Sequence, residues 1–478
     1  MLAPGSGTAD AGPDDQCRAK VSTNLDLVVA AGVSHLVREV FIATEFVAIL
    51  SPTFWWIIGR MRSAAPVWSR VDSFIVVPAS TQWDMNLRRI EAGNDMTEIL
   101  AIGDALAELM PGLRKLDLGV YCLLPKIGEM CGHMAGRVAS QLLTFTAWDT
   151  MYRREDCRLD AIRDLRMWNK GATGWRSPRI SADTLERLDM VQCIDDNLCS
   201  FIDTNSGTNR TIVFRKLKSL RFWPLSYHGT NRIGADARPY HQRLHLPALR
   251  KLGVNCYAAD CLLWSSVVLP ANMDSLDLSM ASATCESIAQ TTLPKVKHLR
   301  LKAYDVYLHT TTTTIRAIDR ILVEAGGYES KMLSITDSIT SVHPDSLACT
   351  GLTWLLLDGP TSVDDLLGFL QKQSRLHYLN LGRVTVGDTH ADMSIPSSDD
   401  DRLVAPLHAT LARLAFAVEG GREVRGKATA LTTRLMLGLP ALASIHASPI
   451  LKRQIVDFVG EYVHRYPHLA GVNIELLF

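Results

Sequence analysis

The chain has 478 residues, 47% of them hydrophobic, and its 50 basic and 50 acidic side chains cancel. This hydrophobic share is that of an ordinary folded protein. The charge balance argues against a general electrostatic attraction to nucleic acid or to an anionic membrane.

The first twenty residues are rich in Gly, Ala, Asp and Pro and lack the apolar core of a signal peptide. We expect residues 1–30 to form a disordered tail. The segment Val40–Gly59 is apolar enough to be a membrane span, but Glu45 and Pro52 interrupt it. Because a carboxylate at mid-bilayer is costly, we favour a buried strand, a turn at Ser51-Pro52 and a short helix through Trp55–Ile58.

One pattern recurs along the rest of the chain: an apolar residue, two others, an apolar residue, one other, and an apolar residue. It starts at Val37, Val71, Leu113, Ile162, Leu185, Leu217, Leu249, Met273, Val296, Leu352, Leu376, Leu411, Leu442 and Leu469, with two weaker copies at Leu143–Phe145 and Leu333–Ile335. This is the strand signature of leucine-rich repeats. The uneven spacing of the copies indicates an irregular array.

Segments of helical periodicity separate several copies, namely Asp95–Met110, Arg316–Ala325 and Ile455–His464. Proline precedes five copies by two residues, where it ends a helix and begins the turn into a strand. We therefore predict an α/β fold, an irregular leucine-rich-repeat solenoid with a curved parallel sheet and helices on its outer face. The usual asparagine or cysteine after each strand is replaced by Tyr121, Tyr257 and Val384 in three repeats.

The solenoid is expected to span residues 31–478 and to carry polar loop insertions. These lie near 203–211, 226–242 and 387–403, where Gly, Pro, Asn and acidic residues replace the apolar pattern.

The end of the chain contains LHYLNLGRVTVGDTHADMSIP (376–396), LHATLARLAF (407–416) and IVDFVGEYVHRYPHLAGVNI (455–474), and HLVREVFI (35–42) lies near its start. In these motifs the chain resembles fungal leucine-rich-repeat-like proteins of the F-box/LRR-like group. The resemblance covers most of residues 35–478 and implies a repeat fold with a binding role.

Many members of that group carry an N-terminal F-box, which opens with a Leu-Pro-x-Glu-like helix start. Residues 1–34 contain no such segment. We therefore expect a non-enzymatic scaffold that binds a protein partner of unknown identity. The alternative is a substrate-recognition subunit of an SCF-type ubiquitin ligase, with ligase components as partners and the F-box missing from this chain.

Catalytic and metal-binding patterns are missing from the sequence. It has no GxSxG, Walker loop or HExxH. His241/His245 lie in a loop-like stretch, and Pro467 interrupts the helical spacing of His464/His468. The ten cysteines form no CxxC, so we expect reduced thiols, no metal, no cofactor and a cytoplasmic or nuclear protein.

Residues between the apolar strand positions are expected to face the concave side of the sheet. Tryptophan, tyrosine and arginine, the usual hot-spot residues of interfaces, recur there. The predicted partner-binding residues are Arg166, Trp168, Arg221, Trp223, His298, Arg300, Trp354 and Tyr378. The arginines and tryptophans among them are expected to hold equivalent positions within their repeats, which a solenoid aligns into one stripe. The alternative interpretation is that the tryptophans pack locally beneath insertions.

Overall fold

Each copy of the apolar pattern, the weaker two included, forms one strand of a 16-stranded parallel sheet in the computed structural model of the chain. The chain divides into two compact units, residues 1–249 with 265–268, and residues 250–264 with 269–478. The structure describes residues 27–28, 30–31, 36–43, 52–65, 67–77, 96–117, 132–148, 158–168, 179–193, 211–224, 244–256, 267–281, 285, 288–289, 292–304, 312–336, 347, 349–385, 406–418, 431–447 and 449–476.

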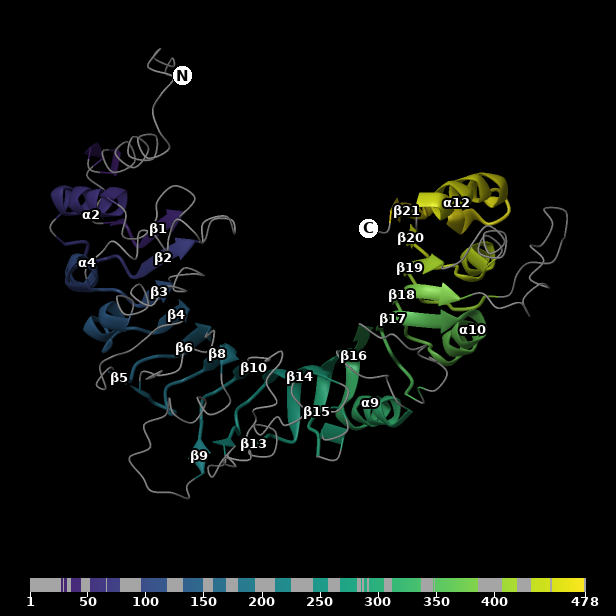
Figure 1. Cartoon of the computed structure of the whole chain (residues 1–478), viewed down its shortest axis with the longest axis horizontal. Coiled ribbons are helices and arrows are strands. Elements are labelled where there is room, and N and C mark those ends of the chain that lie inside the picture. Colours follow the sequence, from purple (N-terminus) through teal and green to yellow (C-terminus); the bar gives the residue numbers. More distant parts are fainter. Residues whose placement is uncertain are drawn as a thin grey trace, which may run out of the picture. The chain divides into compact units, whose positions relative to one another are not determined.

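The first unit contributes seven strands that lie side by side in chain order (Figure 1). They are β1 (Glu39–Ala43), β2 (Ser73–Val77), β3 (Lys115–Asp117), β4 (Thr144–Trp148), β6 (Asp164–Trp168), β8 (Arg187–Cys193) and β10 (Ser219–Pro224). Helices α2 (Pro52–Ala64) and α4 (Met96–Leu109) of this unit contact each other, and residues 132–137 are helical as well.

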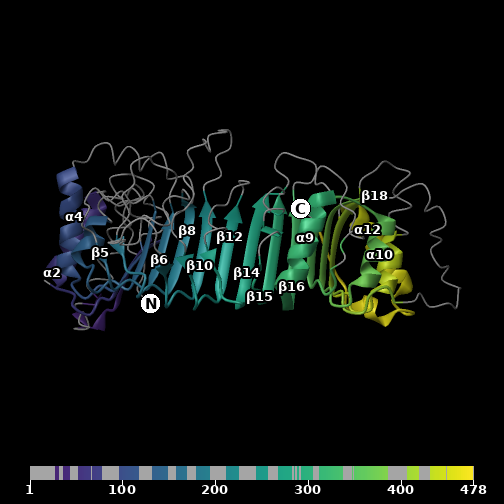
Figure 2. The same cartoon turned by 90° about the horizontal axis from the view of Figure 1, so that it is seen from below.

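The second unit contributes nine strands, and the arrows of neighbouring strands point the same way (Figure 2). They are β12 (Lys251–Cys256), β14 (Asn272–Ala281), β15 (Lys295–Tyr304), β16 (Gly326–Thr336), β17 (Trp354–Ser362), β18 (Tyr378–Thr385), β19 (Arg413–Val418), β20 (Ser444–Ala447) and β21 (Asn473–Leu476). The 3-10 helix η6 (Pro467–Gly471) precedes the last strand. Helices α9 (Thr312–Ala325), α10 (Val363–Lys372) and α12 (Pro449–Tyr462) pack against these strands.

The three predicted helices are confirmed, and so is the order of strand and helix in the apolar segment near the N-terminus. α4, α9 and α12 coincide with the three periodic segments, and β1 followed by α2 replaces the tempting membrane span. The prediction that this strand is buried is wrong, because β1 is the edge strand of the sheet and Phe41 on it is 58% exposed. Among the described residues, no helix has the length and apolar character that crossing a membrane requires.

The core lies beneath the apolar strand positions. Leu252, Leu276 and Leu299 face one another in register on β12, β14 and β15, and at most 3% of each is exposed. Parallel strands stack equivalent positions about 4.8 Å apart, so each leucine packs on the corresponding leucine of the next repeat. The sequence pattern therefore assigned the inward-facing positions correctly.

The connectors of the middle repeats differ from the prediction. From β4 onward, the described connectors of the first unit contain two-residue strands in place of the helices that were expected: β5 (Arg158–Leu159), β7 (Arg179–Ile180), β9 (Ile212–Val213), β11 (Leu244–His245) and β13 (Val267–Val268). β5 pairs with β7, and β11 lies between β9 and β13. An extended connector can hydrogen-bond to the connector of the adjacent repeat at the strand spacing, which satisfies its backbone without a helix.

A buried amide side chain, that of Gln373, satisfies backbone groups in the second unit, but it lies before its strand β18 and not after it. Its Nε2 donates to the carbonyl of Cys349 (2.8 Å), and its Oε1 accepts from the N–H of Leu352 (3.0 Å). His408 continues this chain of bonds. Its Nδ1 accepts from the N–H of Thr410 (3.3 Å), so its Nε2 carries the proton that is donated to the Gln373 carbonyl.

The segments predicted as insertions, 203–211, 226–242 and 387–403, lie outside the described residues except for Thr211. Most of the predicted tail, residues 1–30, also lies outside them. At its end Leu27, Val28 and Ala30 are helical, and the N–H of Ala31 donates to the carbonyl of Leu27 (3.0 Å).

Candidate binding face

Four of the predicted partner-binding residues belong to strands of the first unit and four to strands of the second. In both units they occupy positions that alternate with buried apolar residues, such as Leu165 and Met167 around Arg166. Alternation along a strand therefore places them on the sheet face away from the core.

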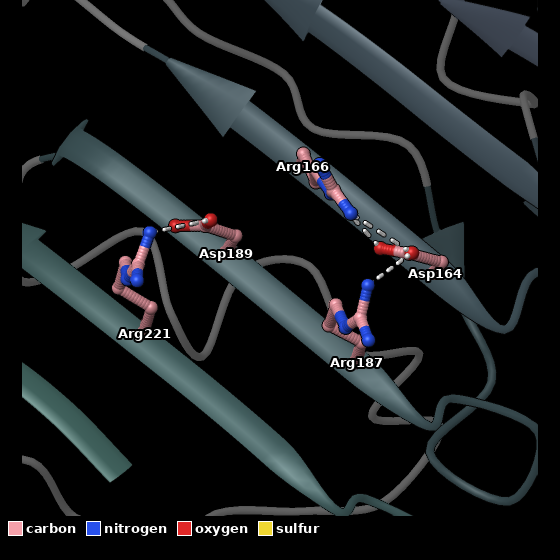
Figure 3. A network of polar contacts seen from close by, with 5 residues as sticks. All are labelled: Asp164, Arg166, Arg187, Asp189 and Arg221. Atoms are coloured by element: carbon pink, nitrogen blue, oxygen red, sulfur yellow. Dashed lines mark hydrogen bonds and ion pairs between the residues drawn. The ribbon is translucent and has the colours of Figure 1, made fainter. Parts of the chain in front are cut away.

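The first unit carries a cluster of charges that we call the charge lattice: Asp164, Arg166, Arg187, Asp189 and Arg221 (Figure 3). In the register, Asp164 faces Arg187, and Asp189 lies between Arg166 and Arg221. Opposite charges thus alternate both along each strand and across strands. Two aspartates are shared by three arginines, so the arginines predicted to bind a partner are already paired within the unit.

The distances within the charge lattice indicate loose pairing. Asp164 Oδ2 lies 3.1 Å from Nη1 of Arg187, whereas Asp189 Oδ2 lies 3.6 Å from Nη1 of Arg221. Burial raises the pKa of Asp189, and the neighbouring arginines only partly offset this. Asp189 Oδ1 is buried and accepts no hydrogen bond from any described residue. Each exposed pair contributes at most about 1 kcal/mol.

Trp168 and Trp223 both lie opposite Val191 in the register, and Trp148 lies opposite Trp168. Trp168 and Trp223 therefore lie in the same register row, as predicted. Their side chains lie outside the described residues, so whether they bind a partner or pack locally stays a prediction.

In the second unit, His298 and Arg300 lie two residues apart on β15. His298 Nε2 is 3.2 Å from a carboxylate oxygen of Glu329, and its Nδ1 is 3.2 Å from the hydroxyl of Ser330. Arg300 Nη1 lies 3.9 Å from a carboxylate oxygen of Asp277. These contacts hold His298 in place, whereas the long distance leaves the Arg300 guanidinium loosely held.

Trp354 and Tyr378 are stacked on adjacent strands. Their ring centroids are 5.1 Å apart, the planes differ by 8°, and both residues are half-buried. They belong to a register row across β15 to β19 that we call the aromatic row: Arg300, Met332, Trp354, Tyr378 and Arg413. An apolar stretch of three side chains thus lies between two exposed arginines on the face away from the core.

The prediction that Arg300 and Trp354 hold equivalent motif positions is wrong. Arg300 follows the middle apolar residue of its repeat, whereas Trp354 precedes the middle apolar residue of its own. The pairing of β15 with β16 shifts by two residues, because Val296 pairs with Gly326 whereas His298 pairs with Ser330. Gly326 and Gly327 lie at this shift and adopt φ of 90° and 64°. Non-glycine residues rarely adopt these angles. The shift brings Arg300 into the row of Trp354.

Five residues of these clusters are absent from the predicted partner-binding residues, namely Asp164, Arg187, Asp189, Met332 and Arg413. The alternation of apolar residues had placed Arg187 and Asp189 on this face, but it had not marked the other three. Asp164 and Arg413 directly precede the middle apolar residue of their repeats, the position that Trp354 also holds. Reading the residue directly before the middle apolar position in every repeat would have identified Asp164 and Arg413. Met332 could not be found in the same way, because the β16 pattern is weak and its register depends on the bulge.

Three titratable groups meet in the core of the second unit. The N–H of Cys349 donates to Asp319 Oδ1 (2.6 Å), and Lys331 Nζ donates to the carbonyl of Thr350 (3.4 Å). Burial raises the pKa of Cys349 to about 12 and lowers that of Lys331. A thiol that stays protonated is a poor nucleophile. His468 of the His464/His468 pair donates from its Nε2 to the carbonyl of Met436 (3.1 Å).

No protein-family model matches the chain, and a search of curated proteins gave no match either.

Proposed function

We propose that this protein is a non-enzymatic binding module that holds a protein partner on the sheet face away from its helices. The observation that supports this best is the stacked pair of Trp354 and Tyr378, half-exposed between two arginines. Tryptophan, tyrosine and arginine dominate the energetics of protein interfaces, and a preformed stack loses little side-chain entropy on binding.

The two units support the proposal unequally. In the charge lattice, each arginine side chain has an aspartate within 3.6 Å, so a partner must compete with internal pairs. In the aromatic row, Arg413 is exposed and has no partner among the residues that the structure describes. A partner therefore gains new contacts there at a smaller cost, because fewer existing pairs are broken.

The test is affinity capture from cell extract followed by mass spectrometry, with the parent chain, Trp354→Ala and a matched control. Val323→Ala is the control, because Val323 is a 55% exposed residue on α9, on the helical side of the sheet. Partners bound by the parent and by Val323→Ala should be lost or weakened with Trp354→Ala. Equal capture by all three chains would show that the partner binds elsewhere.

A further inference from the structure

We infer that the aromatic row binds an extended peptide segment of another protein, with apolar residues at its centre and carboxylates at both ends. This inference rests on the proposed function and adds the chemistry of the partner. Its basis is the order of side chains across five adjacent strands: a cation, three apolar side chains and a second cation.

The strand spacing fixes the length of segment that fits. Arg300 on β15 and Arg413 on β19 are four strand steps apart, which at about 4.8 Å per step is roughly 19 Å. An extended peptide advances about 3.3 Å per residue, so two acidic residues about five to seven positions apart reach both arginines. The residues between them then lie over Met332, Trp354 and Tyr378.

The charges of the face favour an acidic segment over a basic one. Arg413 has no ion pair with any described residue, and Arg300 has only the 3.9 Å contact with Asp277. Lys302 follows Arg300 on the same face of β15, is half-exposed and likewise has no described partner. Two of these three cations, Lys302 and Arg413, therefore have no acidic partner among the described residues.

The arginines are also suited to carboxylates by shape. A guanidinium presents parallel N–H groups that match both oxygens of a carboxylate. Arg413 lies next to Tyr378 in the row. A peptide that covers the Tyr378 ring displaces part of the water around Arg413, and the lower local dielectric constant strengthens an ion pair between Arg413 and a peptide carboxylate. The aromatic stack supplies apolar contact, and the arginines set the spacing of the acidic residues.

A display library of peptides with ten randomised residues, selected against the full chain, tests the inference. Selected peptides should carry Asp or Glu about five to seven positions apart with apolar residues between them. Selection against Arg413→Glu should replace the acid at one end by Lys or Arg and keep the acid at the other end. Arg300→Glu should do the same at the opposite end. Arg316→Glu, an exposed arginine on α9, is the matched control and should select the parental pattern.

The affinities of the parent chain and its variants for one selected peptide complete the test. Trp354→Ala should weaken binding of this peptide roughly 30-fold, as for an interface hot spot. Arg413→Gln should also weaken binding, but it should not create a preference for basic peptides. Enrichment of basic peptides, no enrichment, or an unchanged pattern with Arg413→Glu would overturn the inference. If cellular partners still require Trp354 while the library shows no acidic preference, the peptide chemistry is wrong and the proposed binding face stands.

Discussion

Leu276 lies in the middle of three leucines that stack across β12, β14 and β15, and it is fully buried. Leu276→Ala removes contacts to Leu252 on one side and to Leu299 on the other. Repeat proteins are stabilised mainly by such contacts between neighbouring repeats, so the loss weakens two repeat interfaces at once. Neighbouring strands are held by the sheet and cannot close the resulting cavity completely.

A Leu→Ala change at a packed site costs about 2–5 kcal/mol. For a cooperative unit of this size, each kcal/mol lowers the melting temperature by about 2–4 °C, which gives a decrease of about 4–20 °C. Thermal unfolding followed by circular dichroism measures it, with Val323→Ala, exposed on α9, as the control that should change stability by at most about 0.5 kcal/mol. A Leu276→Ala protein that melts like the parent would show that the strand register is wrong.

Three further predictions concern the second unit. Gln373→Leu leaves the N–H of Leu352 and the carbonyl of Cys349 unpaired, and each should lower the free energy of unfolding by about 1–3 kcal/mol. The control Gln371→Leu, at an exposed position, should leave the free energy of unfolding nearly unchanged. Equal melting temperatures of the two variants would contradict this prediction. Burial lowers the pKa of His408 below 6.5, so its stabilisation is complete above that pH and is lost as the pH falls through the folded-state pKa. Between about pH 7 and about pH 5 the parent should lose more stability than His408→Gln, and parallel losses would refute the assignment. A double-mutant cycle of Trp354→Leu and Tyr378→Leu, followed by denaturant unfolding, should give a coupling of about 0.5–1.5 kcal/mol; strict additivity would mean that the stack is not stabilising.

The strands could be predicted because their signal is local. The apolar spacing around Leu249, Leu352 or Leu411 reports which side chains of a strand face the core, and every copy became a strand of the sheet. The same holds for α4 and α9, whose apolar residues recur at helical spacing. The two-residue connector strands were not predictable, because they depend on pairing with connectors of other repeats.

The sequence by itself determined the fold class, the inward-facing leucines and the residue types available on the opposite face. Only the tertiary structure decided which of those residues are neighbours. Asp164 and Asp189 pair with the arginines of the charge lattice because adjacent strands bring them together. By motif position Trp354 corresponds to His298. The two-residue register shift next to Gly326 and Gly327 nevertheless places Arg300 in the row of Trp354. Such a shift keeps the alternation of side chains intact, so the pattern of apolar residues carries no record of it.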